Sequence, residues 1–261
     1  MIVCADDYGM GEDIDRAILE LCGSNRLSAV SCMVALERCG RDVLKPLLEL
    51  QSGVDIGLHF CIADETLTAL ENKKSLPAFG TVLRQSLLGQ IRANEIRSEI
   101  AAQYELFLKK CGRPPDYIDG HLHAHQLPGI REGLIEFVSS LPPRGRPYVR
   151  NTCEPVKNLR KHRLPWLKAA FIGNYGARML SELRAADIST NEGFAGIYDF
   201  KNYHRYPEYF PGFAACLQKK NGILVVHPGH TENWRRSEFE FLRDSSSAFV
   251  TPNRFQSRTG D

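Results

Sequence analysis

Aspartate and histidine side chains collect directly after short apolar runs that are typical of buried strands. In chain order these polar residues are Asp6 and Asp7, His59, Asp119 with His121, His123 and His125, Arg150, and His227 with His230. Neutral imidazole and carboxylate are the usual ligands of a catalytic divalent metal ion, and both groups also act as acids and bases. The pattern therefore predicts a metal-dependent hydrolytic site.

The two adjacent acids, Asp6 and Asp7, follow the apolar run of residues 1–4. Adjacent like charges repel, and burying either acid without a partner is costly. A metal ion resolves the conflict if one acid ligates it and the other accepts a proton from the attacking water. Turn chemistry is an alternative explanation, because aspartate is also favoured in turns.

The stretch DGHLHAH, residues 119–125, carries three histidines at alternate positions. In an extended segment these histidines would share one face, which favours metal binding or catalysis over a structural role. A single histidine such as His59 is more often a core residue than a ligand, and His227 before Pro-Gly could merely end a strand. The argument therefore depends on the whole set.

Apolar runs alternate with helical patterns along the chain, which predicts a parallel sheet covered by helices. The predicted strands are residues 2–5, 27–35, 54–61, 117–118, 147–149 and 222–226; the predicted helices are residues 14–22, 43–50, 91–108, 130–138, 164–183, a helix after 207, and 238–242. Residues 64–88 show no clean period and are expected to form a long loop.

We expect a single-domain incomplete (β/α) barrel of the TIM-barrel type over residues 1–250, and an irregular tail over 251–261. No GxGxxG or Walker loop supports an open nucleotide-binding sheet. In such barrels the chemistry collects at the carboxyl ends of the strands, where the acids and histidines above would converge.

The composition is that of an ordinary globular protein, with 261 residues, 43% hydrophobic residues and a net charge of +2. This balance argues against a nucleic-acid or anionic-membrane partner. No apolar run approaches the roughly 20 residues of a membrane span, and no signal peptide is evident. The eight cysteines form no CxxC pair, so a reducing, cytoplasmic setting is expected. A homodimer is possible, as for many enzymes of this size.

Five motifs in order along the chain carry a family resemblance. They are ADDYG (5–9), GLHF (57–60), DGHLHAH (119–125), NEGFAG (191–196) and HPGH (227–230). With these motifs the sequence resembles the YdjC-like carbohydrate deacetylases, a family that includes chitooligosaccharide deacetylases and HpnK-like proteins. The resemblance implies an incomplete (β/α) barrel and a divalent-metal hydrolase that removes acetyl groups from N-acetylated sugars.

The resemblance also implies a role for each matching residue. It makes Asp7, His59 and His121 the metal ligands, Asp6 the general base and His227 the general acid, with Arg150, His123, His125, Phe194 and His230 as supporting or substrate-binding residues. Arg150 would either orient Asp6 or contact the substrate. The rings of Phe194 and Tyr198, and those of the segment 203–210, would offer stacking faces for a sugar, although core packing explains Phe194 equally well.

Three points stay open at this level. The family is usually described with magnesium, whereas two histidines and one aspartate also suit zinc, cobalt or nickel. Gly120 and Leu122 depart from the residues common in relatives, which leaves the ligand histidine in place but weakens any inference about substrate preference. Which of His121, His123 and His125 ligates is also open. The natural substrate, a chitin fragment, a glycolipid head group or another acetylated sugar, is not specified.

Two other functions compete with deacetylation. Clustered histidines at barrel strand ends also serve metal-dependent phosphoesterases and amidohydrolases, which often use two metal ions. A non-catalytic carbohydrate-binding relative is the third reading, and the complete set of acid, base and ligands argues against it.

Overall fold

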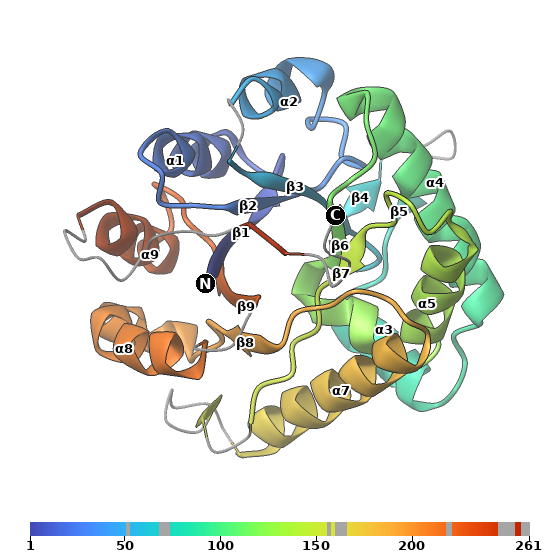
Figure 1. The fold of residues 1–261 in the computed structure, drawn as a ribbon. Helices are drawn as coiled ribbons and strands as arrows, with labels where there is room; N and C mark the ends of the chain where they lie inside the picture. The colour runs from blue at the N-terminus through green and yellow to red at the C-terminus, as the bar shows by residue number, and fades with distance from the viewer. Residues whose placement is uncertain are drawn as a thin grey trace.

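The computed structural model describes residues 1–50, 53–67, 74–155, 158–159, 166–217, 221–244 and 254–256. Within these residues one parallel sheet runs in the order β7-β6-β3-β2-β1-β9-β8. Its strands are β1 (Ile2–Tyr8), β2 (Ala29–Cys32), β3 (Asp55–Phe60), β6 (Tyr117–Gly120), β7 (Tyr148–Val149), β8 (Gly193–Ala195) and β9 (Gly222–Val226). Figure 1 shows the strands in the middle of a ring of helices.

The sheet curls until its two edge strands, β7 and β8, lie next to each other. Val149 of β7 forms an isolated parallel bridge with Thr190, just before β8. Beyond it, the backbone N–H of Asn151 donates to Asn191 Oδ1 at 2.8 Å, and Asn191 Nδ2 donates to the Asn151 carbonyl at 3.0 Å. These side-chain bonds replace the missing strand pairing, and the predicted incomplete barrel is confirmed.

The outer layer follows the predicted alternation of strands and helices. It consists of α1 (Glu12–Gly23), α2 (Arg41–Leu48), α4 (Ala93–Cys111), α5 (Ile130–Ser140), α7 (Trp166–Ala185), α8 (Tyr206–Cys216) and α9 (Asn233–Asp244). In α1 the buried residues Ile14, Ile18 and Leu21 recur at helical spacing and face the sheet. The last helix begins at Asn233, earlier than the predicted 238, because its first turn has Trp234 as a single apolar residue and so shows no apolar period.

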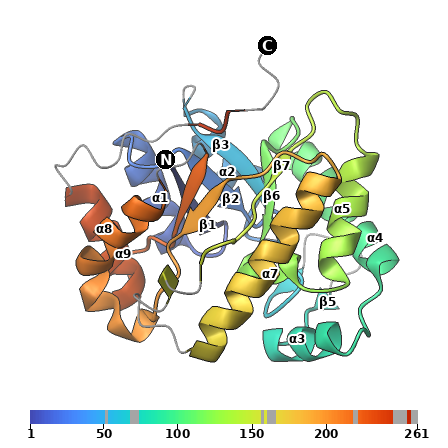
Figure 2. The same cartoon turned by 60° about the horizontal axis from the view of Figure 1, so that its bottom comes forward.

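The segment expected to be a long loop, residues 64–88, is partly regular. It contains an antiparallel pair, β4 (Thr66–Leu67) and β5 (Lys74–Ser75), followed by α3 (Phe79–Leu87). Only Val82 and Ser86 of α3 are buried, so its apolar period is too weak to show in the sequence. The excursion leaves β3 and returns to α4, which places it at the end of the barrel where the strands finish (Figure 2). Strand β8 was also missed, because it has 3 residues and one of them is glycine.

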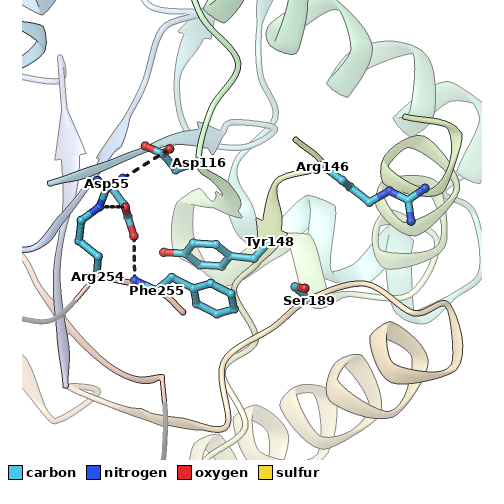
Figure 3. Close-up of a pocket in the computed structure, with 7 residues that line it drawn as sticks. All are labelled: Asp55, Asp116, Arg146, Tyr148, Ser189, Arg254 and Phe255. Carbon is cyan, nitrogen blue, oxygen red and sulfur yellow. Dashed lines mark hydrogen bonds and ion pairs between the residues drawn. The ribbon is translucent and has the colours of Figure 1, made fainter. Parts of the chain in front are cut away.

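A short piece of the C-terminal segment docks at the other end, where the strands begin. Residues 254–256 form no helix or strand, and the rest of the predicted 251–261 tail lies outside the described residues. Arg254 Nε donates to Asp55 Oδ1 at 2.7 Å, and the Phe255 ring stacks on Tyr148 at 3.8 Å between ring centres (Figure 3). The segment leaves a polar cavity of about 240 Å³ beneath it.

The core and the helices agree with the compositional expectations. Cys4, Cys32 and Cys61 are buried thiols, and all eight cysteines lie in described segments without a disulfide. Across the described part of the chain, no helix has both the length and the apolar character that a membrane crossing needs.

Candidate active site

Strand β1 carries both adjacent acids and turns them in different directions. The strand continues through Asp6 and Asp7 to Tyr8, and its pairing with β2 shifts register between Ala5 and Tyr8. Asp7 has a φ of 71°, in the left-handed region that residues other than glycine rarely adopt. Such backbone strain costs about 1–3 kcal/mol and is typical of functional sites. It lets consecutive carboxylates reach different partners.

Asp7, His59 and His121 form a buried cluster at the carboxyl ends of β1, β3 and β6. One ligand atom of each residue lies within 4.8 Å of the others. His59 Nε2 and His121 Nδ1 lie 3.4 Å and 3.2 Å from the same oxygen, Asp7 Oδ1. One carboxylate oxygen and two imidazole nitrogens form a suitable donor set for a catalytic divalent ion with coordination positions left for water and substrate.

Asp119 fixes the orientation of His59 from behind. Its Oδ1 lies 2.6 Å from His59 Nδ1, and its Oδ2 accepts from the Ser31 hydroxyl at 2.5 Å. This contact leaves His59 Nε2 facing Asp7, as is usual for a metal-ligating histidine. Burial alone would lower the pKa of His59, but the charges of Asp119 and Asp6 raise it to about 10. The pocket therefore favours a positive charge at this point.

The histidine row is not extended, so the condition under which its three histidines would share one face is not met. Residues His121–Gln126 form a short 3₁₀ helix, in which Leu122 and His123 have left-handed φ values of 53° and 56°. His121 consequently joins the metal cluster, and the other two histidines face elsewhere.

The remaining histidines of the row support the surroundings of the site. The His123 ring meets Phe194 edge-on at 5.6 Å, and His125 Nε2 lies 2.8 Å from the carbonyl of Arg150. A Cβ atom at position 120 would lie 2.8 Å from the Cβ of His125, which explains the glycine there. His121 is thus the member of the row that lies with Asp7 and His59.

Arg150 holds the second acid of β1. Its guanidinium is fully buried and donates from Nη1 to Asp6 Oδ1 at 2.6 Å and from Nη2 to Asp6 Oδ2 at 2.8 Å. Burial would raise the pKa of Asp6, but the charges of Arg150 and His59, together with the hydrogen bonds from Arg150, outweigh burial and hold this pKa well below its usual range. Asp6 is therefore ionised, and of the two expected roles of Arg150 the geometry favours orientation of Asp6.

A second group with metal-ligand spacing consists of Cys4, Asp6 and Asp119. Here the place of a cation is already taken, because Arg150 Nη1 lies 3.5 Å from Cys4 Sγ and 3.0 Å from Asp119 Oδ2, besides its bond to Asp6. The arrangement leaves the Asp7 cluster as the place for a metal ion among the described residues.

His227 follows β9 and lies beside Asp6, with Nε2 3.9 Å from Asp6 Oδ2. Glu238 of α9 fixes its backbone, because Oε2 accepts the His227 N–H at 2.6 Å. Burial lowers the pKa of His227 to about 4 although Asp6 and Asp7 act in the opposite direction. The imidazole is therefore neutral near pH 7.

The aromatic side chains around the site differ from those expected. Phe194 is 1% exposed, and Tyr198 is fully buried with its hydroxyl bonded to Glu238 at 2.8 Å, so these two expected stacking faces lie in the core. The rings near His227 are instead those of Phe200 and Trp234, whose centres lie 5.8 Å and 5.7 Å from the centre of the imidazole. His230 packs edge-on against Phe239 of α9 at 4.5 Å.

Sequence reasoning also missed Arg235, 228 positions after Asp7, whose Nη2 donates to Asp7 Oδ2 at 2.7 Å. Asp119 stands at a predicted strand end, but neither the residue pattern nor the family resemblance gives it a role of its own. An acid at a strand end beside a histidine is a signal that could have found Asp119. Arg235 leaves no such signal, because its helix meets β1 only in the folded barrel.

Comparison with known proteins gives a family match over most of the chain. The model of the family described as YdjC-like protein matches residues 1–249. Chitooligosaccharide deacetylases of Escherichia fergusonii and Yersinia enterocolitica are 29% and 30% identical to the chain over 53% and 55% of its length. The alignments span 55% and 58% of those two proteins, just over half of each. The deacetylase of Serratia marcescens is 27% identical over 70% of this chain and 71% of its own.

A solved structure supports the fold. It is that of an Enterococcus faecalis protein named as a proposed cellobiose-phosphate cleavage protein, with a TM-score of 0.60 and 16% identity over 94% of this chain and 90% of that one. Because the family model covers nearly the whole sequence, the chain belongs to the YdjC-like protein family.

Proposed function

We propose that this protein is a metal-dependent hydrolase that removes acetyl groups from N-acetylated sugars. The observation that carries the proposal is the buried Asp7–His59–His121 cluster, with the ionised Asp6 on the same strand as Asp7. The relatives named chitooligosaccharide deacetylases support the substrate class.

The cluster would hold one divalent ion through Asp7 Oδ1, His59 Nε2 and His121 Nδ1. A bound ion of this kind polarises the amide carbonyl and lowers the pKa of a water molecule toward neutrality. The donor set suits zinc, cobalt or nickel, and magnesium is the metal that the family resemblance implies.

Asp6 is suited to accept the proton of the attacking water, because Arg150 keeps it ionised and oriented. His227 is neutral at rest and so does not bring a proton of its own. We infer that the proton moves from Asp6 to His227 Nε2, 3.9 Å away, and from there to the departing amine. The water oxygen bonds to the acetyl carbon, the C–N bond breaks, and acetate and the free amine leave.

The sugar would lie against the rings beside His227. The ring centres of Phe200 and Trp234 lie 4.7 Å apart, and each ring centre lies within 6 Å of that of His227. Aromatic faces next to a polar centre suit the apolar face of a pyranose ring. These two residues replace Phe194 and Tyr198 as the proposed sugar contacts.

The main alternative, a phosphoesterase or amidohydrolase with two metal ions, needs a second metal centre. The second acidic group already contains the guanidinium of Arg150, which argues for one ion per chain. Elemental analysis separates the two functions, because a ratio of two metal ions per chain would favour the alternative.

The test uses the full chain, stripped of metal with a chelator and reloaded with Zn²⁺ or Mg²⁺, together with N-acetylglucosamine oligomers. We expect acetate release that disappears on chelation and returns with metal. Asp7→Asn should lower metal content and acetate release together, because it removes the negative charge of the carboxylate whose Oδ1 faces both histidines. Asp42→Asn, an exposed acid of α2, is the control and should change neither. If the metal-loaded protein releases no acetate from any acetylated sugar, the proposal fails.

A further inference from the structure

The two carboxylate oxygens of Asp7 have different partners. Oδ1 faces His59 Nε2 at 3.4 Å and His121 Nδ1 at 3.2 Å, whereas Oδ2 accepts from Arg235 Nη2 at 2.7 Å. We propose that Arg235 is a positioning residue that holds Asp7 so that only Oδ1 faces the metal ion. The inference rests on the proposed metal-dependent function.

Arg235 is itself held from three sides. Its Nε donates to Glu232 Oε2 at 2.8 Å, and its guanidinium lies over the Trp234 ring, 4.4 Å from the ring centre. A Cβ at Gly229 would lie 3.1 Å from the Cβ and Cδ of Arg235, so glycine makes room for the arginine stem. The arginine side chain is 6% exposed. A donor fixed in this way can fix the carboxylate that it contacts.

Stability alone does not explain this arrangement. Removing a guanidinium from water is costly, and Arg235 Nη1 has no hydrogen-bond partner within the part of the chain that the structure describes. Its partner Asp7 has a left-handed backbone as well, with a φ of 71°. A buried charge with an unpaired donor and a strained residue therefore meet at one carboxylate. Such costs are usually found where a functional group must be held in place.

The expected consequence concerns metal affinity. With Oδ2 occupied by Arg235, Asp7 binds the metal through a single oxygen and loses little freedom when the metal arrives. Without the arginine, the carboxylate can rotate or present both oxygens. Loss of a hydrogen-bond partner behind a metal ligand typically weakens metal affinity or activity by about 10–100-fold.

The chain offers a matched control in the next residue. Arg236 lies on the same helix, is exposed, and donates to Asn233 Oδ1 at 2.9 Å rather than to the site. The variants are Arg235→Met, Arg235→Lys and Arg236→Met, each prepared without metal. Zn²⁺ affinity is measured by calorimetry in the absence of substrate, with the unfolding temperature of the metal-free protein as a second readout.

We expect Arg235→Met to bind Zn²⁺ about 10–100-fold more weakly than the unmodified chain. The metal-free unfolding temperature should fall as well, because Asp7 would stay buried without its cationic partner, so Zn²⁺ affinity is compared at a temperature at which every variant is folded. Arg235→Lys should recover part of the affinity, since lysine keeps one charged donor, and Arg236→Met should stay within about twofold.

A folded Arg235→Met protein with Zn²⁺ affinity within twofold of the unmodified chain would overturn the inference. If that variant does not fold, Arg235→Lys decides in its place, and unchanged affinity and unchanged turnover again count against it. If the unmodified chain binds no metal, both this inference and the proposed function fail. If Arg235→Met weakens Zn²⁺ binding but the unmodified chain releases no acetate, the inference about Arg235 is supported and only the proposed deacetylation is refuted.

Discussion

The two ends of the barrel each contain a buried aspartate, and the two aspartates are equally buried. Asp7 at the carboxyl end and Asp55 at the amino end are both 3% exposed. Both oxygens of Asp55 have permanent donors, Arg254 Nε at 2.7 Å and the Phe255 N–H at 3.1 Å. In Asp7 only Oδ2 has a permanent cationic donor, and Oδ1 faces two imidazoles. Burial therefore does not reveal the role of a buried acid, whereas its partners do.

The two ends also differ in the backbone conformation of the acid and in the side chains around it. Asp7 has a left-handed φ of 71°, while Asp55 starts β3 in ordinary strand geometry. At the amino end, Tyr117, Tyr148 and Phe255 stack in series beside the acid, with ring centres 5.0 Å and 3.8 Å apart. That end closes the barrel, which agrees with the general division between a stabilising face and a reactive face in (β/α) barrels.

The largest expected effect belongs to Asp6→Asn at the carboxyl end. The amide cannot accept the proton of the attacking water, so kcat should fall by about 10²–10⁴-fold, the usual contribution of a general base. Metal affinity should be retained, because Asp7, His59 and His121 are unchanged. Acetate release and Zn²⁺ calorimetry measure the two quantities. A variant that kept full turnover would remove Asp6 from the reaction and weaken the contrast between the two ends.

The second prediction concerns the pH dependence of stability at the carboxyl end. Burial, with the charge of Arg150, lowers the pKa of His125 to about 4. Its unfolded pKa is about 6.5. Above pH 6.5 the histidine is neutral in both states, so its titration takes nothing from the free energy of unfolding. As pH falls from 6.5 toward 4, the unfolded state binds a proton that the folded state does not, and about 3 kcal/mol of unfolding free energy is lost.

Urea unfolding at pH 7 and pH 4.5 tests this prediction with His125→Gln, which cannot titrate. The variant should lose less stability than the unmodified chain between the two pH values. Burial also lowers the pKa of His123 and of His227, so part of the acid sensitivity should remain. An equal loss in both proteins would show that His125 does not contribute to acid sensitivity.

The smallest effect is expected for Asp55→Asn at the amino end. The substitution removes the charge that pairs with Arg254 and with the Phe255 N–H, so the free energy of unfolding should fall by about 1–3 kcal/mol. Because Asp55 lies at the opposite end from the metal cluster, kcat should stay within about twofold. Denaturant unfolding and acetate release check both parts. A large loss of turnover with unchanged stability would contradict the division between the two ends.

Several parts of the fold and site could be predicted because they depend on local pattern. Strands β1, β3 and β9 are apolar runs followed by a polar residue, and this pattern placed Asp6, Asp7, His59 and His227 at one end of the barrel. Helix α3 and strand β8 could not be predicted, since an exposed helix and a strand of 3 residues leave little periodicity.

The sequence by itself determined the alternation of strands and helices, the family, and the polar residue types that end each strand. The tertiary structure decided how those side chains point. Left-handed backbones at Asp7, Leu122 and His123 direct neighbouring side chains to different partners. The arginines that complete the site, Arg150 and Arg235, reach β1 from positions 144 and 228 residues away. Contacts of this range depend on closure of the whole barrel. Arg150 follows a predicted strand and could be expected at the site, whereas no local pattern in the chain points to Arg235.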